Sequence, residues 1–279
     1  MENIMSNDKK SSPIGVFDSG VGGLTVAKEI MRQMPNEKII YFGDTARVPY
    51  GNKSKETVTR FSKQIVRFLQ TQDVKTIVVA CNTASAYALE ELEQELDIPV
   101  IGVVKPGAKV AADKTKNGKI GVIATSATIG SRIYSQYINQ IDENMQILGK
   151  ACPLFVPLVE EGLIEDPVTR EIASRYLSEL IDQDIDTLIL GCTHYPLIRK
   201  TIGEIMGEHV TLVNPAYETA RELSILLKER NLHNEVKPDL GSNQYRFFVS
   251  DGAEKFKSFA NSIIKYGILS AKTIQIEEY

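Results

Sequence analysis

The sequence predicts an α/β protein of two similar lobes, each a mainly parallel sheet flanked by helices. Short apolar segments of strand length alternate with longer amphipathic segments along the 279 residues. This alternation is typical of parallel sheets joined by right-handed helical crossovers. One short segment also occurs twice, which indicates two copies of one unit. We therefore expect lobes related by a pseudo-twofold duplication, with the functional site between them.

The repeated segment ends in a polar sequence that contains a cysteine. Residues 72–83 read QDVKTIVVACNT and residues 183–194 read QDIDTLILGCTH, with no gap in the match. A second match pairs IGVFDS at 14–19 with IGVIAT at 120–125. Buried strands are built from the same few apolar residue types, so chance resemblance is the alternative. We prefer duplication because both matches follow the same order at similar offsets.

Strands and helices alternate in the first half from residue 14 onward. Residues 76–80 form a nearly continuous apolar run, as expected for a strand covered on both faces. Val58, Phe61, Ile65 and Leu69 recur with helical spacing. We expect strands at 14–17, 38–42, 76–80 and 98–103, with the last ending near Pro106. We expect helices at 24–34, at 54–70 and from about residue 83.

The pattern restarts after residue 118 and continues to the C-terminus. We expect strands at 119–123, 145–148, 186–190 and 210–213. We expect helices at 131–140, 168–183, 198–206 and from Pro215 to about residue 230. A polar region at 231–244 interrupts the alternation, and the expected final elements are a strand at 246–249, a helix at 253–266 and a strand at 273–276.

The composition excludes several classes of protein. An apolar fraction of 43% and a charged fraction of 24% are ordinary for a soluble globular chain. The net charge of −4 gives no overall basic surface for nucleic acid. No apolar run approaches the roughly 18 residues of a membrane span, and the polar N-terminus does not read as a signal peptide. The cysteines and histidines show no metal-ligand spacing. We expect a cytoplasmic protein with reduced cysteines.

Cys81 and Cys192 follow equivalent strands, and each precedes a predicted helix. Ligands of parallel α/β proteins bind beyond the carboxyl ends of strands, and a helix N-terminus there favours thiolate. A single cysteine at such a position would more often be a core residue. Two at equivalent positions of a repeat, each followed by polar residues, favour a functional pair facing one site. Cys152 has no comparable motif, and we interpret it as structural.

Three further segments carry polar groups near the ends of predicted elements. DSGVGG at 18–23 resembles a phosphate loop but lacks the lysine of a P-loop and the third glycine of a dinucleotide motif. A tight turn that admits close backbone approach is the alternative, and its Asp18 could hold an ammonium, orient a base or cap a helix. RVPYG at 47–51 could bind an anion through backbone N–H groups, with Tyr50 as a wall, or form a plain loop. The segment LVEEG at 158–162 places two glutamates after an apolar run, and glutamates on a helix surface are usually solvated.

Together these segments resemble the glutamate racemases, within the cofactor-independent amino-acid racemases. The resemblance rests on five signatures that span nearly the whole chain in order, without a departure at a motif position. They are FDSGVGG at 17–23, GDTARVPYG at 43–51, ACNTAS at 80–85, PLVEEG at 157–162 and GCTHYP at 191–196. The resemblance implies an enzyme that interconverts L-glutamate and D-glutamate without a cofactor or metal and supplies D-glutamate for peptidoglycan.

The resemblance also implies roles for individual residues. One cysteine, as thiolate, removes the α-proton from one face of the substrate, and the other thiol delivers a proton to the opposite face. Asp18 is expected to assist Cys81, whereas His194 and Glu160 are expected to assist Cys192. The residues implied to hold the substrate carboxylates and amino group are Asp18, Ser19, Pro49, Tyr50, Gly51, Asn82, Thr83, Thr125, Thr128, Thr193 and His194.

The domain organisation expected from the same resemblance is discontinuous. The first lobe comprises residues 1–105 plus 216–279, and the second comprises residues 106–215. A homodimer is the expected assembly, with a small amino acid as the ligand and neither nucleic acid nor membrane as a partner.

Several alternatives remain at this point. The nearest is a racemase for aspartate or a related small acid on the same scaffold. A decarboxylase would need one catalytic cysteine, so the second cysteine argues against it. A carboxylate-binding regulatory module without turnover is disfavoured by the intact cysteine pair, and a nucleotide-binding protein is disfavoured further.

Overall fold

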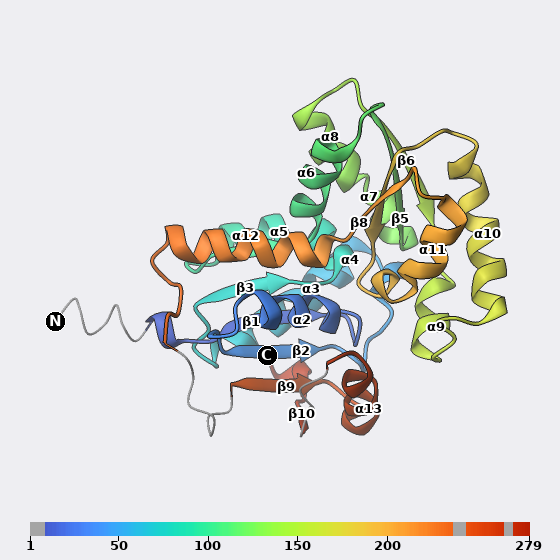
Figure 1. Cartoon of the computed structure of the whole chain (residues 1–279). Coiled ribbons are helices and arrows are strands. Elements are labelled where there is room, and N and C mark those ends of the chain that lie inside the picture. Colours follow the sequence, from blue (N-terminus) through green and yellow to red (C-terminus); the bar gives the residue numbers. More distant parts are fainter. Residues whose placement is uncertain (1–8, 237–243, 265–269) are drawn as a thin grey trace.

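A computed structural model of the protein, which describes residues 9–236, 244–264 and 270–279, contains two parallel sheets with helices packed against them (Figure 1). The first sheet has six strands in the order β10-β9-β2-β1-β3-β4, and the second has four in the order β6-β5-β7-β8. The paired strands of both sheets run parallel. The predicted fold class is confirmed.

The strands lie close to the predicted positions in both halves of the chain. Those of the first sheet are β1 (Ile14–Asp18), β2 (Ile39–Gly43), β3 (Thr76–Val79), β4 (Val100–Gly102), β9 (Tyr245–Val249) and β10 (Ala271–Thr273). Those of the second are β5 (Lys119–Ala124), β6 (Gln146–Ala151), β7 (Thr187–Gly191) and β8 (Thr211–Val213).

The helices connect successive strands and cover the sheets. The α-helices associated with the first half are α2 (Leu24–Gln33), α3 (Lys55–Gln70), α4 (Asn82–Tyr87), α5 (Leu89–Glu95) and α6 (Val104–Lys114). Those that follow are α7 (Ser126–Ser131), α8 (Ile133–Ile141), α9 (Phe155–Glu160), α10 (Pro167–Ile181), α11 (Arg199–Met206), α12 (Pro215–Glu229) and α13 (Ala253–Ile263). Short 3₁₀ turns are η1 (Tyr50–Asn52), η2 (Tyr195–Ile198) and η3 (Ile276–Glu278).

The strand order of the two sheets supports the predicted duplication. In β2-β1-β3-β4 and β6-β5-β7-β8 the first strand of each unit lies between its second and third, and the fourth follows the third. The register agrees as well, since Ile14 pairs with Thr76 in the first sheet and Ile120 pairs with Thr187 in the second. The two sequence matches make Ile14 equivalent to Ile120 and Thr76 equivalent to Thr187. The internal repeat is therefore a structural repeat.

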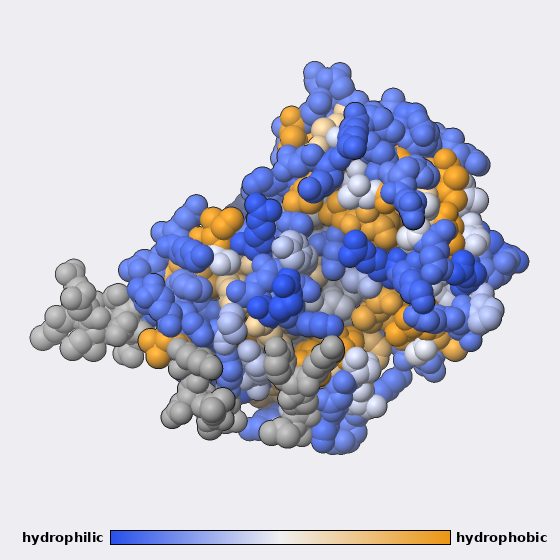
Figure 2. Space-filling view, in the orientation of Figure 1, coloured by the Kyte–Doolittle hydropathy of each residue, from blue (hydrophilic) through white to orange (hydrophobic). Residues whose placement is uncertain are grey.

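Each sheet has a hydrophobic core on both of its faces. Ile14 and Val16 of β1 contribute to one core, whereas Phe17 contributes to the core on the opposite face. Val122 and Ile123 of β5 divide in the same way between two further cores. No helix in the described ranges is long and apolar enough to span a membrane. Figure 2 shows one face of the molecule, on which hydrophilic residues interrupt the hydrophobic areas.

Some elements differ from the prediction. Helix α6 (Val104–Lys114) was not expected, because Pro106 suggested an end to regular structure; it is the third residue of the helix, where its missing N–H is not needed. The single helix expected after residue 83 is divided into α4 and α5 at Ala88.

The C-terminal predictions are correct only in part. The strand expected at 273–276 is wrong in position: β10 ends at Thr273, and the fully buried Ile276 begins the turn η3 instead. The helix expected at 253–266 ends at Ile263. The last two residues of that expected helix lie outside the described ranges.

Candidate active site

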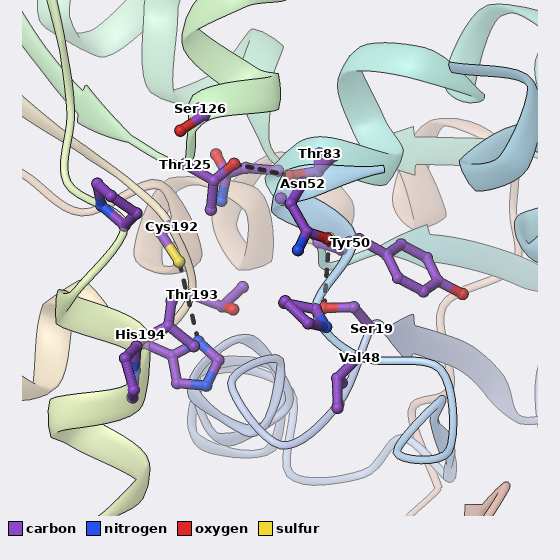
Figure 3. Close-up of a pocket in the computed structure, with 18 of the residues that line it drawn as sticks. Ser19, Val48, Tyr50, Asn52, Thr83, Thr125, Ser126, Cys192, Thr193 and His194 are labelled. Carbon is purple, nitrogen blue, oxygen red and sulfur yellow. Dashed lines mark hydrogen bonds between the residues drawn. The ribbon is translucent and has the colours of Figure 1, made fainter. Parts of the chain in front are cut away.

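A cavity of about 370 Å³ lies where the carboxyl ends of the two sheets meet. Its walls come from the loops that follow β1, β2 and β3 of the first sheet and β5, β6 and β7 of the second, as expected for a parallel α/β protein. Figure 3 shows this cavity with its lining side chains. The lining residues are Ser19, Gly20, Val48, Pro49, Tyr50, Gly51, Asn52, Cys81, Asn82, Thr83, Thr125, Ser126, Pro153, Val156, Pro157, Glu160, Cys192, Thr193 and His194.

Cys81 lies at the N-cap of α4, directly after β3. Its Sγ accepts a hydrogen bond from the N–H of Ala84 at 3.5 Å and lies 3.7 Å from Oγ of Ser19. Sequence reasoning expected the helix N-terminus to favour the thiolate. In the structure burial outweighs that effect, and together with the negative charge of Asp18 it raises the pKa of Cys81 to about 12. Cys81 is therefore a thiol near neutral pH.

Cys192 has different surroundings. Its Sγ lies 3.8 Å from Nδ1 of His194 (Figure 3), and Nε2 of that ring lies 3.0 Å from Oε1 of Glu160. Burial disfavours the imidazolium, but the interactions with Cys192 and Glu160 outweigh it and raise the pKa of His194 to about 10. The hydrogen bond from His194 lowers the pKa of Glu160. The geometry thus forms a line from carboxylate through imidazolium to sulfur.

The helix expected at 198–206 is confirmed as α11, and a short turn separates it from Cys192. The turn η2 (Tyr195–Ile198) comes first, and α11 begins only at Arg199. Tyr195 is fully buried and donates to the carbonyl of Cys152 at 2.8 Å. Cys152 itself is buried and does not line the cavity, in agreement with its interpretation as structural.

Asp18 lies behind the cavity rather than in its lining. The carboxyl group is fully buried, accepts the N–H of Gly20 at 2.9 Å, and receives the hydroxyl of Thr193 at 3.4 Å. Burial raises the pKa of Asp18. Asp18 therefore contacts the Cys192 loop as well as influencing the charge state of Cys81.

A cluster of hydroxyl groups joins the two sheets beside the thiols. Oγ1 of Thr83 lies 3.0 Å from that of Thr125 (Figure 3) and 3.1 Å from that of Thr128. Thr83 and Thr125 line the cavity, whereas Thr128 lies behind them. Asn82 lines it as well, and its carbonyl oxygen accepts the hydroxyl of Tyr134 at 2.7 Å, which leaves the amide N–H₂ as the donor.

The loop after β2 lines the cavity but does not contribute an aromatic ring to it. Figure 3 shows the Tyr50 ring pointing away from the cavity, and its hydroxyl donates to the carboxylate of Asp44. The expectation that this ring forms a wall is therefore wrong. Gly51 approaches Thr125 so closely that an added Cβ would lie 2.6 Å from the threonine Cβ. The absence of a side chain at Gly51 lets the loop meet the second sheet.

The glycines of 18–23 also serve close approach. A Cβ on Gly22 would lie 2.3 Å from Oγ1 of Thr193 and 2.4 Å from Nδ1 of His194. The hydroxyl of Thr25 bonds the carbonyl of Thr193 at 3.0 Å. This segment is thus a packing surface for the Cys192 loop, in line with the tight-turn interpretation.

Sequence reasoning did not single out the apolar part of the cavity. Pro153, Val156 and Pro157 form this wall, and Val48 and Asn52 were also missed. Apolar residues after a strand carry no chemical signature, so only the proximity of Pro157 to Glu160 in PLVEEG could have pointed to them. The cavity lining in the described residues includes no lysine or arginine.

Comparison with known proteins gives consistent results. A model of the Asp/Glu/hydantoin racemase family matches residues 14–223. The chain is 51% identical to a glutamate racemase from Geobacter metallireducens over 90% of its own length and 92% of the relative. The chain belongs to the glutamate racemases of the Asp/Glu/hydantoin racemase family.

Solved structures of glutamate racemases share the fold. The enzyme from Bacillus anthracis is 44% identical, with a TM-score of 0.90 over 95% of this chain and 98% of that one. The enzyme from Francisella tularensis, solved in complex with D-glutamate, is 40% identical, with a TM-score of 0.90 over 97% of this chain and 100% of that one. The protein is thus an amino-acid racemase.

Proposed function

We propose that the protein interconverts L-glutamate and D-glutamate by moving the α-proton between Cys81 and Cys192. The observation that carries the proposal is that both thiols line one cavity from equivalent strand ends of two repeated units. A base on one face of the α-carbon and an acid on the other invert the centre without turning the intermediate. Two thiolates in one closed cavity would repel, so one cysteine is ionised while its partner is protonated.

The charges around the two sulfurs support a division of roles. With a pKa of about 12, Cys81 is the proton donor of the resting enzyme, because burial and the negative charge of Asp18 keep it protonated. The His194 imidazolium, held by Glu160, stabilises a thiolate at Cys192. After one turnover the proton resides on Cys192, and the same pair is poised for the opposite direction.

Neutral donors in the cavity suit an amino acid with two carboxylates. The hydroxyls of Ser19, Thr83 and Thr125, the amide of Asn82 and the backbone N–H groups of Tyr50 and Gly51 supply them. Such preorganised donors are effective in a cavity that excludes water, and they also stabilise the charge that develops at the reacting carbon. We assign Thr128 to the support of Thr83 and Thr125, since it does not line the cavity.

The biological setting follows the family. We propose that the protein works in the cytoplasm and supplies D-glutamate for peptidoglycan. We propose two lobes, residues 1–105 plus 216–279 and residues 106–215, each containing one of the sheets. We also propose a homodimer, because Ile141 and Ile225 are about half exposed and lie in one groove, where association would cover them. Light scattering would measure the assembly.

The activity is tested by following optical rotation of L-glutamate, and separately D-glutamate, with purified protein and no added cofactor. Both are expected to approach the racemate. The aspartate enantiomers are the comparison substrates. Turnover of aspartate without turnover of glutamate would assign the protein to the aspartate alternative, and turnover of neither would favour a binding module.

Single cysteine variants test the two-thiol scheme. Cys81→Ala and Cys192→Ala each remove one acid–base group and are expected to lower kcat by about 10²- to 10⁴-fold. Cys152→Ala is the matched control and is expected to retain activity, because Cys152 lies outside the cavity lining. Full activity in either of the first two variants would rule out the scheme.

A further inference from the structure

Asp44 is a buried carboxylate that the proposed chemistry does not use. It lies directly after β2, is fully buried and is absent from the cavity lining. Its Oδ2 accepts the hydroxyl of Tyr50. Its Oδ1 accepts the hydroxyl of Ser250 at 2.8 Å, and Nε of Arg47 donates to both oxygens at 3.0 and 2.8 Å. One carboxylate therefore accepts hydrogen bonds from three different side chains.

Two of these partners attach the loop to fixed elements. The guanidinium of Arg47 lies 4.0 Å from the centroid of the Phe61 ring, and its Nη1 donates to Gln64 at 2.6 Å. Both contacts are on α3. Ser250, at the end of β9, accepts the N–H of Ala46 at 2.8 Å. The segment that leaves β2 is thus tied on one side to α3 and on the other to β9.

The third partner, Tyr50, is the point where this network reaches the cavity. Its ring is 1% exposed, lies 5.7 Å from the Phe61 ring centroid and points away from the cavity (Figure 3). Pro49, Tyr50 and Gly51 nevertheless line the cavity, and Gly51 can do so only with its backbone. Anchoring the Tyr50 hydroxyl to Asp44 therefore determines how the adjoining backbone faces the substrate space.

We propose that Asp44 is a positioning residue for substrate binding, which holds the backbone of residues 48–51 in its binding conformation through Tyr50 and Arg47. The assignment rests on the proposed function, because it concerns the loop that we expect to bind a substrate carboxylate. Neutral N–H donors bind an anion well only when they are fixed in advance, since ordering a loop on binding costs conformational entropy.

An ionised aspartate suits this position better than its amide. The carboxylate offers acceptor sites on both oxygens, and its partners Tyr50, Ser250 and Arg47 all donate. Asparagine would place an N–H₂ group against one of these donors. It would also leave the side chain of Arg47, which is 11% exposed, without its anionic partner.

The test uses the full-length protein and two conservative variants, Asp44→Asn and Tyr50→Phe, the second of which keeps the buried ring. For each, kcat and KM are measured with both enantiomers of glutamate, and Tm is measured in parallel. We expect KM to rise about tenfold or more in both directions, with kcat reduced less. The double variant should raise KM by less than the product of the single effects, because both changes break one interaction. Tyr217→Phe, an exposed tyrosine on α12, is the matched control and should leave KM unchanged.

The outcomes separate the two levels of the proposal. In one outcome the native protein turns over glutamate, while both variants show a lower Tm but an unchanged KM. That result would make Asp44 a purely structural residue and overturn this assignment alone. Failure of the native protein to racemise glutamate would refute the proposed function and the positioning role together. A raised KM for both enantiomers supports the positioning role.

Discussion

Cys81 and Cys192 stand at equivalent ends of two repeated units, but the charges around them differ. Burial together with the negative charge of Asp18 raises the pKa of Cys81, whereas the imidazolium of His194 lies beside Cys192. Under the proposed function, these surroundings give the two sulfurs different roles in a pair that shares one proton. The repeat is imperfect at this point, CNT against CTH, and under the proposed function the two sides of the cavity hold different parts of one substrate.

Replacing Glu160 with glutamine tests whether this carboxylate keeps His194 protonated beside Cys192. The pKa of His194 is raised to about 10, so its imidazolium persists from acid through neutral pH and is lost as the pH rises through that value. Removing the anionic partner should lower this pKa, so the alkaline loss of activity should begin at lower pH. We also expect kcat/KM at its optimum to fall about tenfold. The measurement is the pH profile of kcat/KM.

Glu161→Gln is the control for that experiment. It removes the same charge from the next residue, which is exposed and outside the cavity lining. Its pH profile should match that of the native protein. An unchanged profile in Glu160→Gln would show that His194 does not depend on this carboxylate.

Some residues of the site could be predicted from the sequence, and others could not. The positions of Cys81, Cys192 and His194 followed from motifs beside strand ends, because such chemistry has a local signature. The direction of the Tyr50 ring had no such signature, since it depends on Asp44 and Phe61, which come from other elements. The burial of Asp18 behind the lining likewise depends on the approach of Thr193 from the other sheet.

At the element scale, the repeated sequence reflects a repeated packing arrangement. A Cβ on Gly15 of β1 would lie 3.2 Å from Val74 and 3.3 Å from Leu69. A Cβ on Gly121 of β5 would lie 2.5 Å from Ile185, the residue equivalent to Val74 in the repeat. Each IGV strand thus uses its glycine to admit an aliphatic side chain from the segment before the cysteine strand.

Element prediction succeeded where one physical signal dominated. The central strands β1, β2, β3, β5 and β7 are almost fully buried and have nearly continuous apolar runs, so their positions were largely correct. The ambiguous places were Pro106, which is tolerated in the first turn of α6 but resembles a stop, and Ile276, whose burial in a turn imitates the end of a strand. In both cases the deciding information is tertiary.

Gly22→Ala is the prediction that belongs to this scale. The new methyl would collide with Thr193 and His194, so the turn before α2 and the Cys192 loop must separate. We expect a loss of about 1–3 kcal/mol in unfolding free energy and a fall of about 10²-fold in kcat/KM, because small displacements of catalytic groups are costly. Denaturant unfolding and initial rates give the two values.

Gly130→Ala provides the matched comparison. Gly130 lies in α7, and an added Cβ there would meet no atom within 4 Å. Its replacement should leave activity unchanged and stabilise the protein by about 0.5–1 kcal/mol through helix propensity. Equal effects of the two substitutions would contradict the role given to Gly22.

At the scale of the whole molecule, one buried ion pair ties distant parts of the chain. Nζ of Lys75, before β3, bonds the carboxylate of Glu37, the carbonyl of Lys10 at 2.7 Å and that of Leu232 at 2.8 Å. Lys75→Met should destabilise the protein by about 3–5 kcal/mol, because the fully buried Glu37 would lose its lysine partner and keep only its contacts with Asn234 and His233. Urea unfolding measures this loss. Lys63→Met, which breaks exposed pairs, should cost less than about 1 kcal/mol.

The two sheets are also joined directly across the cavity. The hydroxyls of Thr83 and Thr125 meet at 3.0 Å, and Tyr87 donates to the carbonyl of Ala127 at 3.1 Å. These polar contacts lie beside the substrate space, so a ligand that engages both walls adds to them. We therefore predict that ligand binding in the cavity is coupled to the association of the two units.

Glutamate is accordingly expected to stabilise the molecule as one unit. At a concentration of about 100 times Kd, an equilibrated mixture of the enantiomers should add about 2.7 kcal/mol and raise Tm by several degrees. Scanning calorimetry should show the rise in a single transition, because the ligand bridges both sheets. Thr83→Val keeps the shape but removes one bridging hydroxyl, so its ligand-induced rise at the same concentration should be smaller. A ligand that shifted only one of two separate transitions would show that substrate is held by one unit alone.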